Sequence, residues 1–182
     1  MELTKKERDS LLDIAKKTIT AKVNNKDLQK FTVDSAILKE KRGAFVTLKK
    51  SGHLRGCIGY IKAVKPLWET VQEMALAAAF HDPRFPSLKA EELKELTFEI
   101  SVLSPLQRVQ DIDEIQVGKH GLFIARGHNS GLLLPQVASE HGWDRETFLN
   151  ETCCKAGLQP QAWQDKETEI YIFSADYFGD AD

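Results

Sequence analysis

A histidine, an arginine and a cysteine lie close together in the octapeptide HLRGCIGY at residues 53–60. The segment has the pattern of a β-strand, in which successive side chains point to opposite faces. One face would then carry His53, Arg55, Cys57 and Gly59. The other face would carry Leu54, Gly56 and Ile58 and pack into the core. Same-face neighbours on a strand lie roughly 6–7 Å apart, so the Arg55 guanidinium would favour the thiolate form of Cys57.

Cys57 is therefore the first catalytic candidate. A nucleophilic cysteine needs a nearby base, and His53 lies two positions beyond Arg55, too far along the strand to serve. His120 is the second catalytic candidate, and His81 is another base that the fold could bring to Cys57. The alternative is that Cys57 is a small buried hydrophobic residue, which is the usual role of a free cysteine.

The candidate ligand-binding residues are Arg55, Gly56, Gly59, Asp82 and Arg84. Glycines let the backbone amides approach an anion closely, although the spacing here is not that of a phosphate-binding P-loop. Asp82 and Arg84 come from HDPRFP at residues 81–86, a rigid loop that contains two prolines. Such a loop either carries function on a fixed scaffold or is a structural turn held by an internal Asp82–Arg84 pair, and both interpretations remain open.

The histidines are scattered, and the chain contains neither a Cys-x-x-Cys nor a His-Glu-x-x-His motif. These are the spacings that commonly bind zinc, so we expect no metal site. Nothing in the sequence indicates a particular cofactor.

The composition excludes several classes of protein. The 182 residues are 42% hydrophobic and 29% charged, an ordinary balance for a globular chain. The net charge of −2 lacks the basic surplus typical of nucleic-acid binding. No apolar run reaches the ~20 residues that span a bilayer, and residues 1–20 lack the apolar core of a signal peptide. Three cysteines, two of them adjacent, do not form a secreted disulfide framework, so we expect a reduced, cytoplasmic protein.

Local signals predict the elements that would position these residues. Thr4 and Glu7 have the spacing of a capping box, which begins an amphipathic helix to about residue 21. A strand at 44–48 and a Ser51–Gly52 turn lead into the 53–60 strand as a hairpin. Pro66 opens a second helix, whose alanines at 77–79 suggest close packing on a sheet. Further elements are a short helix at 91–96, strands at 97–102, 122–125, 132–134 and 170–173, and helices beginning at Pro135 and after Asp144. Hairpins without a regular βαβ rhythm favour an α+β fold.

The hexapeptide LRGCIG at 54–59 resembles the signature of the AMMECR-type domain, called protein A of the AmmeMemoRadiSam gene set in bacteria and archaea. Further blocks agree in the family's order: DPRF at 82–85, ISVLS at 100–104, GKHGL at 118–122, LLLPQVA at 132–138 and KAGL at 155–158. The resemblance implies one α+β domain over residues 1–182, with a larger and a smaller subdomain and a cleft between them. Mixed or antiparallel sheets flanked by helices would build both subdomains. Tyr60 stands where a small polar residue is common in the family.

The family has no established reaction, so the resemblance carries over no catalytic roles. Proposals for it include an enzymatic role of the signature and a basic role in transcription, replication, repair or translation. Its gene set pairs it with a Memo-type protein, related in fold to extradiol dioxygenases, and with a radical SAM protein.

Three hypotheses follow. In the first, the protein is an enzyme or enzyme component that binds a small anionic ligand at a cleft lined by the Arg55 and Cys57 strand. In the second, it is a non-catalytic adaptor or binding module for the Memo-type or radical SAM partner. The third, a nucleic-acid-related role, draws only on the proposals for the family, and the absent basic surplus argues against it.

Overall fold

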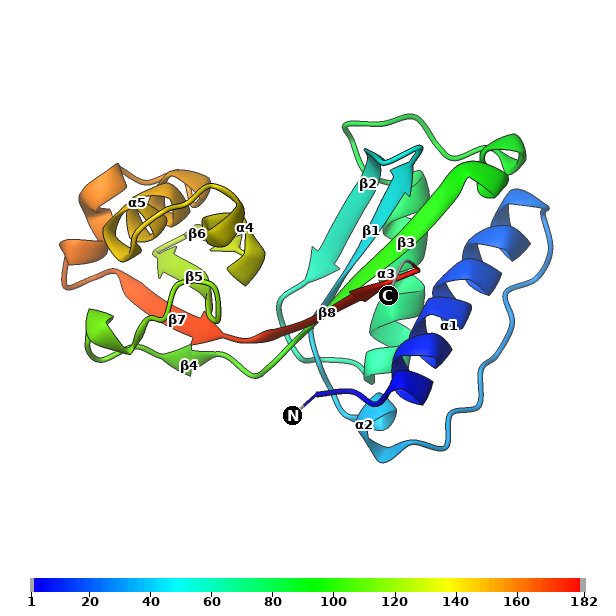
Figure 1. Cartoon of the computed structure of the whole chain (residues 1–182), viewed down its shortest axis with the longest axis horizontal. Helices are drawn as coiled ribbons and strands as arrows, with labels where there is room; N and C mark the ends of the chain where they lie inside the picture. The colour runs from blue at the N-terminus through cyan, green and yellow to red at the C-terminus, as the bar shows by residue number, and fades with distance from the viewer. Residues whose placement is uncertain (1, 181–182) are drawn as a thin grey trace. The chain divides into compact units, whose positions relative to one another are not determined.

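The computed structural model describes residues 2–180, which form an α+β fold, as predicted (Figure 1). The chain divides into two compact units. The first comprises Met1–Leu103 and Asp176–Asp182, and the second comprises Ser104–Ala175. The predicted larger and smaller subdomains correspond to these units, each of which has its own sheet and its own apolar core. The cleft between them and the extent of the domain stay predictions.

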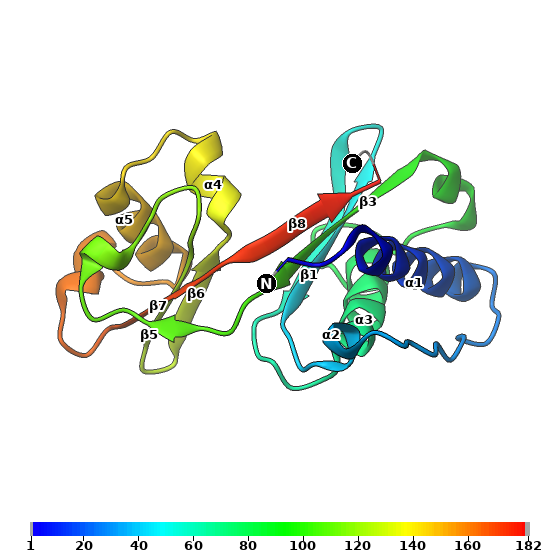
Figure 2. The ribbon, with the colours of Figure 1, turned by 60° about the horizontal axis from the view of Figure 1, so that its bottom comes forward.

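The first unit is a four-stranded sheet in the order β2-β1-β3-β8. Its strands are β1 (Ala44–Lys50), β2 (His53–Tyr60), β3 (Leu96–Leu103) and β8 (Ala175–Gly179). Both β2 and β3 pair with β1 in antiparallel fashion, so β2 is an edge strand. Helices α1 (Lys5–Val23) and α3 (Leu67–Phe80) lie side by side on one face of the sheet (Figure 2). That face of β1 carries Ala44, Val46 and Leu48, which belong to the core cluster with both helices.

Helix α1 begins as the sequence predicts. The Thr4 hydroxyl accepts the Glu7 N–H at 3.4 Å, and the Glu7 carboxylate accepts the Thr4 N–H at 2.8 Å. This capping box satisfies amide groups that the helix itself leaves without partners. The helix buries one apolar stripe, which includes Leu11, Leu12, Ala15 and Ile19, and it ends two residues beyond the predicted boundary.

The predicted hairpin is also confirmed. Ser51 and Gly52 both have positive φ, 50° and 80°, between β1 and β2. Two successive left-handed residues match the right-handed twist of the flanking strands, which is why short hairpins favour them. The turn therefore places β2 beside β1 with a definite register.

The alanine-rich segment of α3 packs closely on the sheet, as its composition suggests. A Cβ atom built on Gly56 would lie 2.1 Å from the Ala78 carbonyl oxygen, well inside van der Waals contact. The backbone of β2 thus touches the backbone of α3, and this approach requires glycine at position 56. Short α2 (Ala36–Lys39) and the 3-10 helix η1 (Ala90–Glu95) complete the unit, and η1 stands where a short helix is predicted.

The second unit has the strand order β4-β7-β5-β6. Its strands are β4 (Gln107–Arg108), β5 (Gly121–Arg126), β6 (Asn129–Leu133) and β7 (Glu169–Phe173). Its helices are α4 (Pro135–Glu140), α5 (Arg145–Lys155) and the 3-10 helices η2 (Ile112–Glu114) and η3 (Pro160–Gln164). Strand β7 lies between two neighbours, which confirms the central position predicted from its continuous apolar run.

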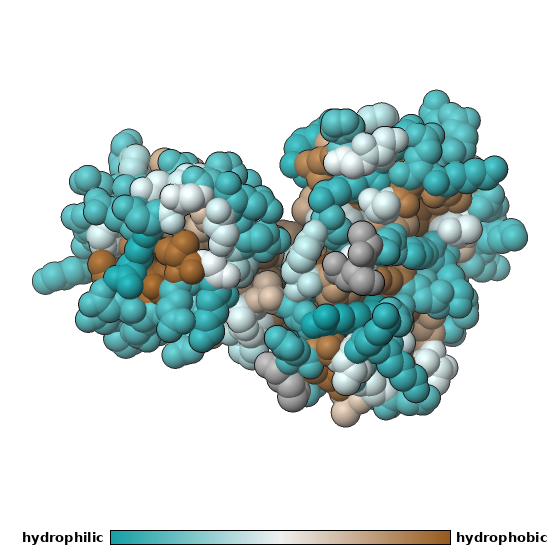
Figure 3. Space-filling model, in the orientation of Figure 1, coloured by the Kyte–Doolittle hydropathy of each residue, from teal (hydrophilic) through white to brown (hydrophobic). Residues whose placement is uncertain are grey.

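On the face shown in Figure 3, apolar side chains appear in places among a largely hydrophilic surface. None of the helices within residues 2–180 combines the length and the apolar character needed to cross a membrane.

Replacing Gly56 with alanine should destabilise the protein strongly, because the added methyl group must push α3 away from β2. We expect a loss of about 3 kcal/mol in the free energy of unfolding, measured by urea denaturation. Gly52→Ala is the control, since it has positive φ but open space around it and should cost only about 1 kcal/mol. A larger loss for Gly52→Ala than for Gly56→Ala would contradict this account.

Candidate functional site

A β-bulge divides the signature strand. In β1, Leu48 pairs with Gly56 of β2, but the next residue, Lys49, pairs with Leu54. Arg55 is therefore an extra residue of β2 that has no opposite residue in β1. A bulge of this kind reverses the alternation of side chains along the strand. The expectation that Leu54 shares the core face with Gly56 is therefore wrong, and Leu54 is 42% exposed.

Cys57 lies on the face that α1 and α3 do not cover. It pairs with Thr47, and Leu54 pairs with Lys49, two residues further along the same face of β1. The Thr47 hydroxyl donates a hydrogen bond to the Cys57 sulfur at 3.1 Å. The thiol is free and half-buried, so the alternative of a fully buried cysteine does not hold.

Arg55 lies on the opposite, helix-covered side. Its Nε and Nη2 donate to the two carboxylate oxygens of Glu92 at 2.9 and 3.0 Å. Glu92 also accepts a hydrogen bond from Lys50, which follows Lys49 in β1 and so points to the other face of the sheet. The predicted shared face of Arg55 and Cys57 is therefore wrong, because the bulge places the two side chains on opposite sides of β2.

The Arg55–Glu92 pair is largely removed from water. Arg55 is 8% exposed as a residue, and its guanidinium also lies 5.9 Å from the centre of the Phe85 ring. Arg55 is the main cause that lowers the pKa of Glu92 to about 2, with help from the Lys89 N–H and Lys50. The positive charge predicted to serve the thiol or an anion is thus neutralised inside the protein.

Asp82 and Arg84 bind the free edge of β2, and we call this pair the clasp. The Asp82 carboxylate accepts the Cys57 N–H at 2.9 Å, and Arg84 Nη2 donates to the Cys57 carbonyl oxygen at 3.3 Å. The clasp takes the place that a neighbouring strand would have beside Cys57, so it satisfies backbone groups at the edge of the sheet.

The two members of the clasp also bind each other. Arg84 Nε and Nη2 donate to the Asp82 oxygens at 3.0 and 2.8 Å, which is the internal pair that the sequence left open. The side chain of Asp82 is 1% exposed, whereas that of Arg84 is 54% exposed. The Arg84 guanidinium holds the pKa of Asp82 well below its usual range, and the Cys57 and Arg84 N–H groups add to this effect. Asp82 therefore has a structural role, while a ligand role for Arg84 stays a proposal.

The space expected beside the signature glycines is filled by the protein. Gly56 touches α3, and a Cβ atom on Gly59 would lie 2.2 Å from the ring of Phe45. The Cys57 amide is already bound by Asp82. The glycines thus allow close packing of α3 and Phe45, and a ligand role for Gly56 and Gly59 stays a prediction.

His120 belongs to the second unit, immediately before β5. Its Nδ1 accepts the Gln116 N–H at 3.2 Å, and burial is the main cause that lowers its pKa. The ring is therefore held locally as a neutral acceptor. Its pairing with Cys57 stays a prediction. His53 pairs with Lys50, so it lies on the face of β2 opposite Cys57.

Within residues 2–180, no group of three or more histidine, cysteine or acidic side chains is placed to hold a metal ion.

Sequence reasoning missed three partners of the signature: Glu92, Thr47 and Phe45. Thr47 and Phe45 follow from the predicted hairpin once its register is known. Glu92 is 37 residues from Arg55, and no local signal connects the two.

Both the sequence and the fold of this chain are similar to those of known proteins. A model of the AMMECR1 family matches residues 12–178, and the chain belongs to this family. It is 50% identical over 148 residues to a protein of Methanothermobacter thermautotrophicus, covering 78% of this chain and 77% of the relative. It is 42% identical to Protein NEQ441 of Nanoarchaeum equitans, covering 93% and 98%. The crystal structure of uncharacterised protein PH0010 from Pyrococcus horikoshii has a TM-score of 0.87 and 40% identity, covering 93% of this chain and 89% of that one.

Replacing Glu92 with glutamine should destabilise the protein at neutral pH, because Arg55 would keep its charge with no carboxylate beside it. We expect a loss of about 2 kcal/mol in the free energy of unfolding at pH 7. Since the pKa of Glu92 is lower in the folded protein than its usual 4.5, its contribution is complete above about pH 4.5 and is lost as the pH falls toward 2.

The difference between variant and parent should therefore shrink at pH 3. Glu91→Gln is the matched control, since Glu91 is exposed and adjacent, and it should change stability little at either pH. A Glu92→Gln deficit that is equally large at pH 3 and pH 7 would show that the ion pair is not its cause.

Proposed function

We propose that the protein is an enzyme or enzyme component that binds a small ligand on the Cys57 face of the first sheet, with the Cys57 thiol as the reacting group. One observation carries the proposal: the signature residues hold Cys57 on a face that α1 and α3 do not cover. Arg55, Gly56 and Gly59 are used in packing and ion pairing, and the clasp holds the Cys57 backbone. Of the polar side chains of the signature, these contacts leave the Cys57 thiol to face a ligand.

The exposed positive charge near Cys57 favours an anionic ligand. Arg84 is more than half exposed at the edge of β2, and its Nη2 donates to the Cys57 carbonyl oxygen at 3.3 Å. Thr47 donates a hydrogen bond to the sulfur from the neighbouring strand. A guanidinium that is partly exposed can bind an anion through charge-assisted hydrogen bonds. In this proposal Arg84 therefore takes the role that the sequence assigned to Arg55, and His120 remains a candidate base.

Alkylation tests whether Cys57 reacts. In a Cys154→Ser background, which removes the exposed second thiol, iodoacetamide should label Cys57 in the folded protein, as located by peptide mass spectrometry. Thr47→Val removes the donor to the sulfur and should slow labelling about threefold at neutral pH. Thr97→Val is the control, because Thr97 is exposed on β3 and no contact with the thiol is recorded for it within residues 2–180.

Two outcomes would overturn the reactive role. One is a Cys57 that stays unlabelled until the protein unfolds. The other is a folded Cys57→Ser variant that supports normal growth in a strain lacking the native gene under conditions where that gene is required.

A second candidate, a binding module for the Memo-type or radical SAM protein, is favoured by exposed apolar surface on the same face. Leu54 lies on the Cys57 side of the sheet and is 42% exposed. Tyr177 is 46% exposed, and its neighbour Phe178 points into the core. The two side chains lie on opposite edge strands of the sheet, β2 and β8, and exposed large side chains of this kind are enriched at protein interfaces.

Leu54→Asp should weaken co-purification with the Memo-type protein of the same organism at least about tenfold, since a charge at the centre of an interface is costly. Val64→Asp, at a site that is 50% exposed outside the sheet, should leave it unchanged. Equal binding by both variants would contradict an interface on this face.

A further inference from the structure

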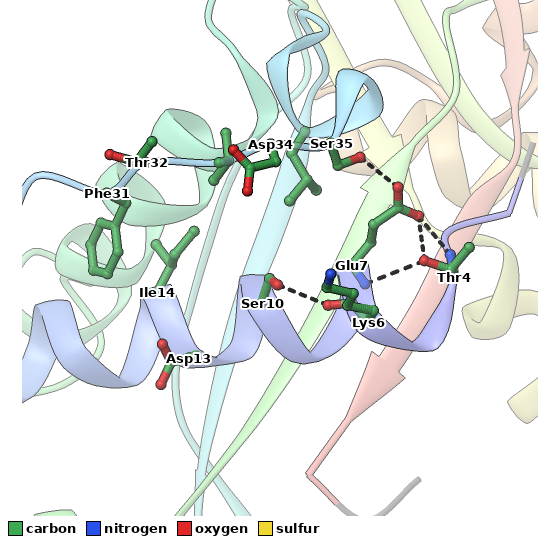
Figure 4. A pocket seen from close by; sticks show the side chains of 12 residues that line it. Thr4, Lys6, Glu7, Ser10, Asp13, Ile14, Phe31, Thr32, Asp34 and Ser35 are labelled. Atoms are coloured by element: carbon green, nitrogen blue, oxygen red, sulfur yellow. Dashed lines mark hydrogen bonds between the residues drawn. The ribbon is translucent and has the colours of Figure 1, made fainter.

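A groove separate from the Cys57 face lies between α1 and the segment that leads to α2 (Figure 4). Its volume is about 460 Å³, within the range of ligand-binding sites. The first three turns of α1 form one wall, and residues 31–35 form the other. Ile14 and Leu38 are buried at its base, and Phe31 and Val33 add half-buried apolar surface.

Most polar groups at the α2 end of the groove already have partners. The Glu7 carboxylate binds Thr4 and accepts the Ser35 hydroxyl at 2.5 Å, and the Ser10 hydroxyl donates to the Lys6 carbonyl oxygen. Asp34 differs, because no partner for its carboxylate is recorded within residues 2–180, and Figure 4 shows it pointing into the gap between the segment and the helix. The lining therefore combines an apolar base with an available negative charge.

The segment itself is an extended chain without pairing. Side chains alternate between exposed and half-buried over residues 30–35, the period of a β-strand. Yet the backbone of residues 30–34 makes no hydrogen bond to any other residue among 2–180. The connection from Asn24 to Ser35 has no regular secondary structure, and connections of this length in a compact unit are commonly functional. An extended backbone with unpaired donors and acceptors can accept a further strand.

We propose that residues 30–34 and the groove bind an extended peptide segment of a partner protein by strand addition. The peptide backbone pairs with residues 30–34. One apolar side chain enters the groove above Ile14 and Leu38, and a neighbouring arginine or lysine pairs with Asp34. Asp13 at the rim is already paired with Lys17 at 2.7 Å, so Asp34 is the carboxylate that recognises the basic residue, while Lys6, near Glu7, disfavours a second basic residue at that end.

Peptides of defined sequence test this proposal on the full chain labelled with ¹⁵N. The probe is acetyl-Thr-Val-Arg-Val-Thr-amide. It should shift the amide signals of residues 30–34 and slow their hydrogen exchange. Asp34→Asn should weaken its binding about threefold, the value of one exposed charge pair. Asp27→Asn is the matched control, since Asp27 lies in the same connection outside the groove and should leave binding unchanged.

Two further probes separate strand addition from other modes. In acetyl-Thr-Pro-Arg-Pro-Thr-amide the prolines remove backbone donors, so it should not protect residues 30–34. In acetyl-Thr-Val-Glu-Val-Thr-amide the charge is reversed, so it should bind more weakly than the arginine peptide. Ser10→Trp, which fills the groove from the exposed side of α1, should abolish binding without unfolding the chain.

The proposal is overturned if the arginine peptide leaves residues 30–34 unshifted at millimolar concentration. Equal binding of the glutamate peptide, or of the Asp34→Asn variant, would overturn the charge match. Equal protection by the proline peptide would overturn strand addition.

Discussion

The Asp82 carboxylate, bound at once to the Cys57 amide and to Arg84, is the contact on which the signature strand depends. Strand β2 is an edge strand, and backbone groups at an edge are otherwise left to water or to another chain. A carboxylate and a guanidinium together present the acceptor and the donor that a neighbouring strand would present. Because the Asp82 side chain is almost fully buried, its negative charge persists only beside Arg84. The clasp therefore joins the end of α3 to the middle of β2.

The signature residues have different physical tasks under this constraint. Gly56 lets α3 approach, Gly59 gives room to the Phe45 ring, and Arg55 ties the bulge to Glu92 in η1. These contacts all lie in the first unit and fix the position of β2 against its neighbours. Cys57 differs, since its backbone is held by the clasp while its side chain faces away from the helices. Most contacts of the signature residues thus serve to fix the position of β2.

Features set by neighbouring residues could be predicted from the sequence, whereas those set by distant partners could not. The capping box of α1 and the Ser51–Gly52 turn each depend on residues within a few positions of one another. The alanines at 77–79 indicated that α3 packs closely, but the residue that they meet, Gly56, required the fold. The bulge depends on the register between β1 and β2, and strict alternation gives no sign of it. Because of that single extra residue, Leu54 lies on the face opposite to the predicted one. For the same reason Arg55 and Cys57 lie on different faces of β2. Asp82 and Arg84 were singled out by residue type, but their target on the Cys57 backbone required the fold.

The bulge also changes which residues can act together on a ligand. Without the bulge, Arg55 and the Cys57 thiol would share one face and could bind an anion together. With the bulge, Arg55 lies on the helix side, where Glu92 neutralises its charge. Under the proposed function, a ligand at the thiol would therefore contact Arg84 at the edge of β2 and Thr47 beside the sulfur, rather than Arg55. Arg84 can hold the clasp and still contact a ligand, because its guanidinium binds Asp82 while the side chain stays more than half exposed. A ligand that drew Arg84 away from Asp82 would uncover a buried carboxylate, at a cost of several kcal/mol. The proposed function therefore favours ligands that approach Arg84 without breaking the clasp.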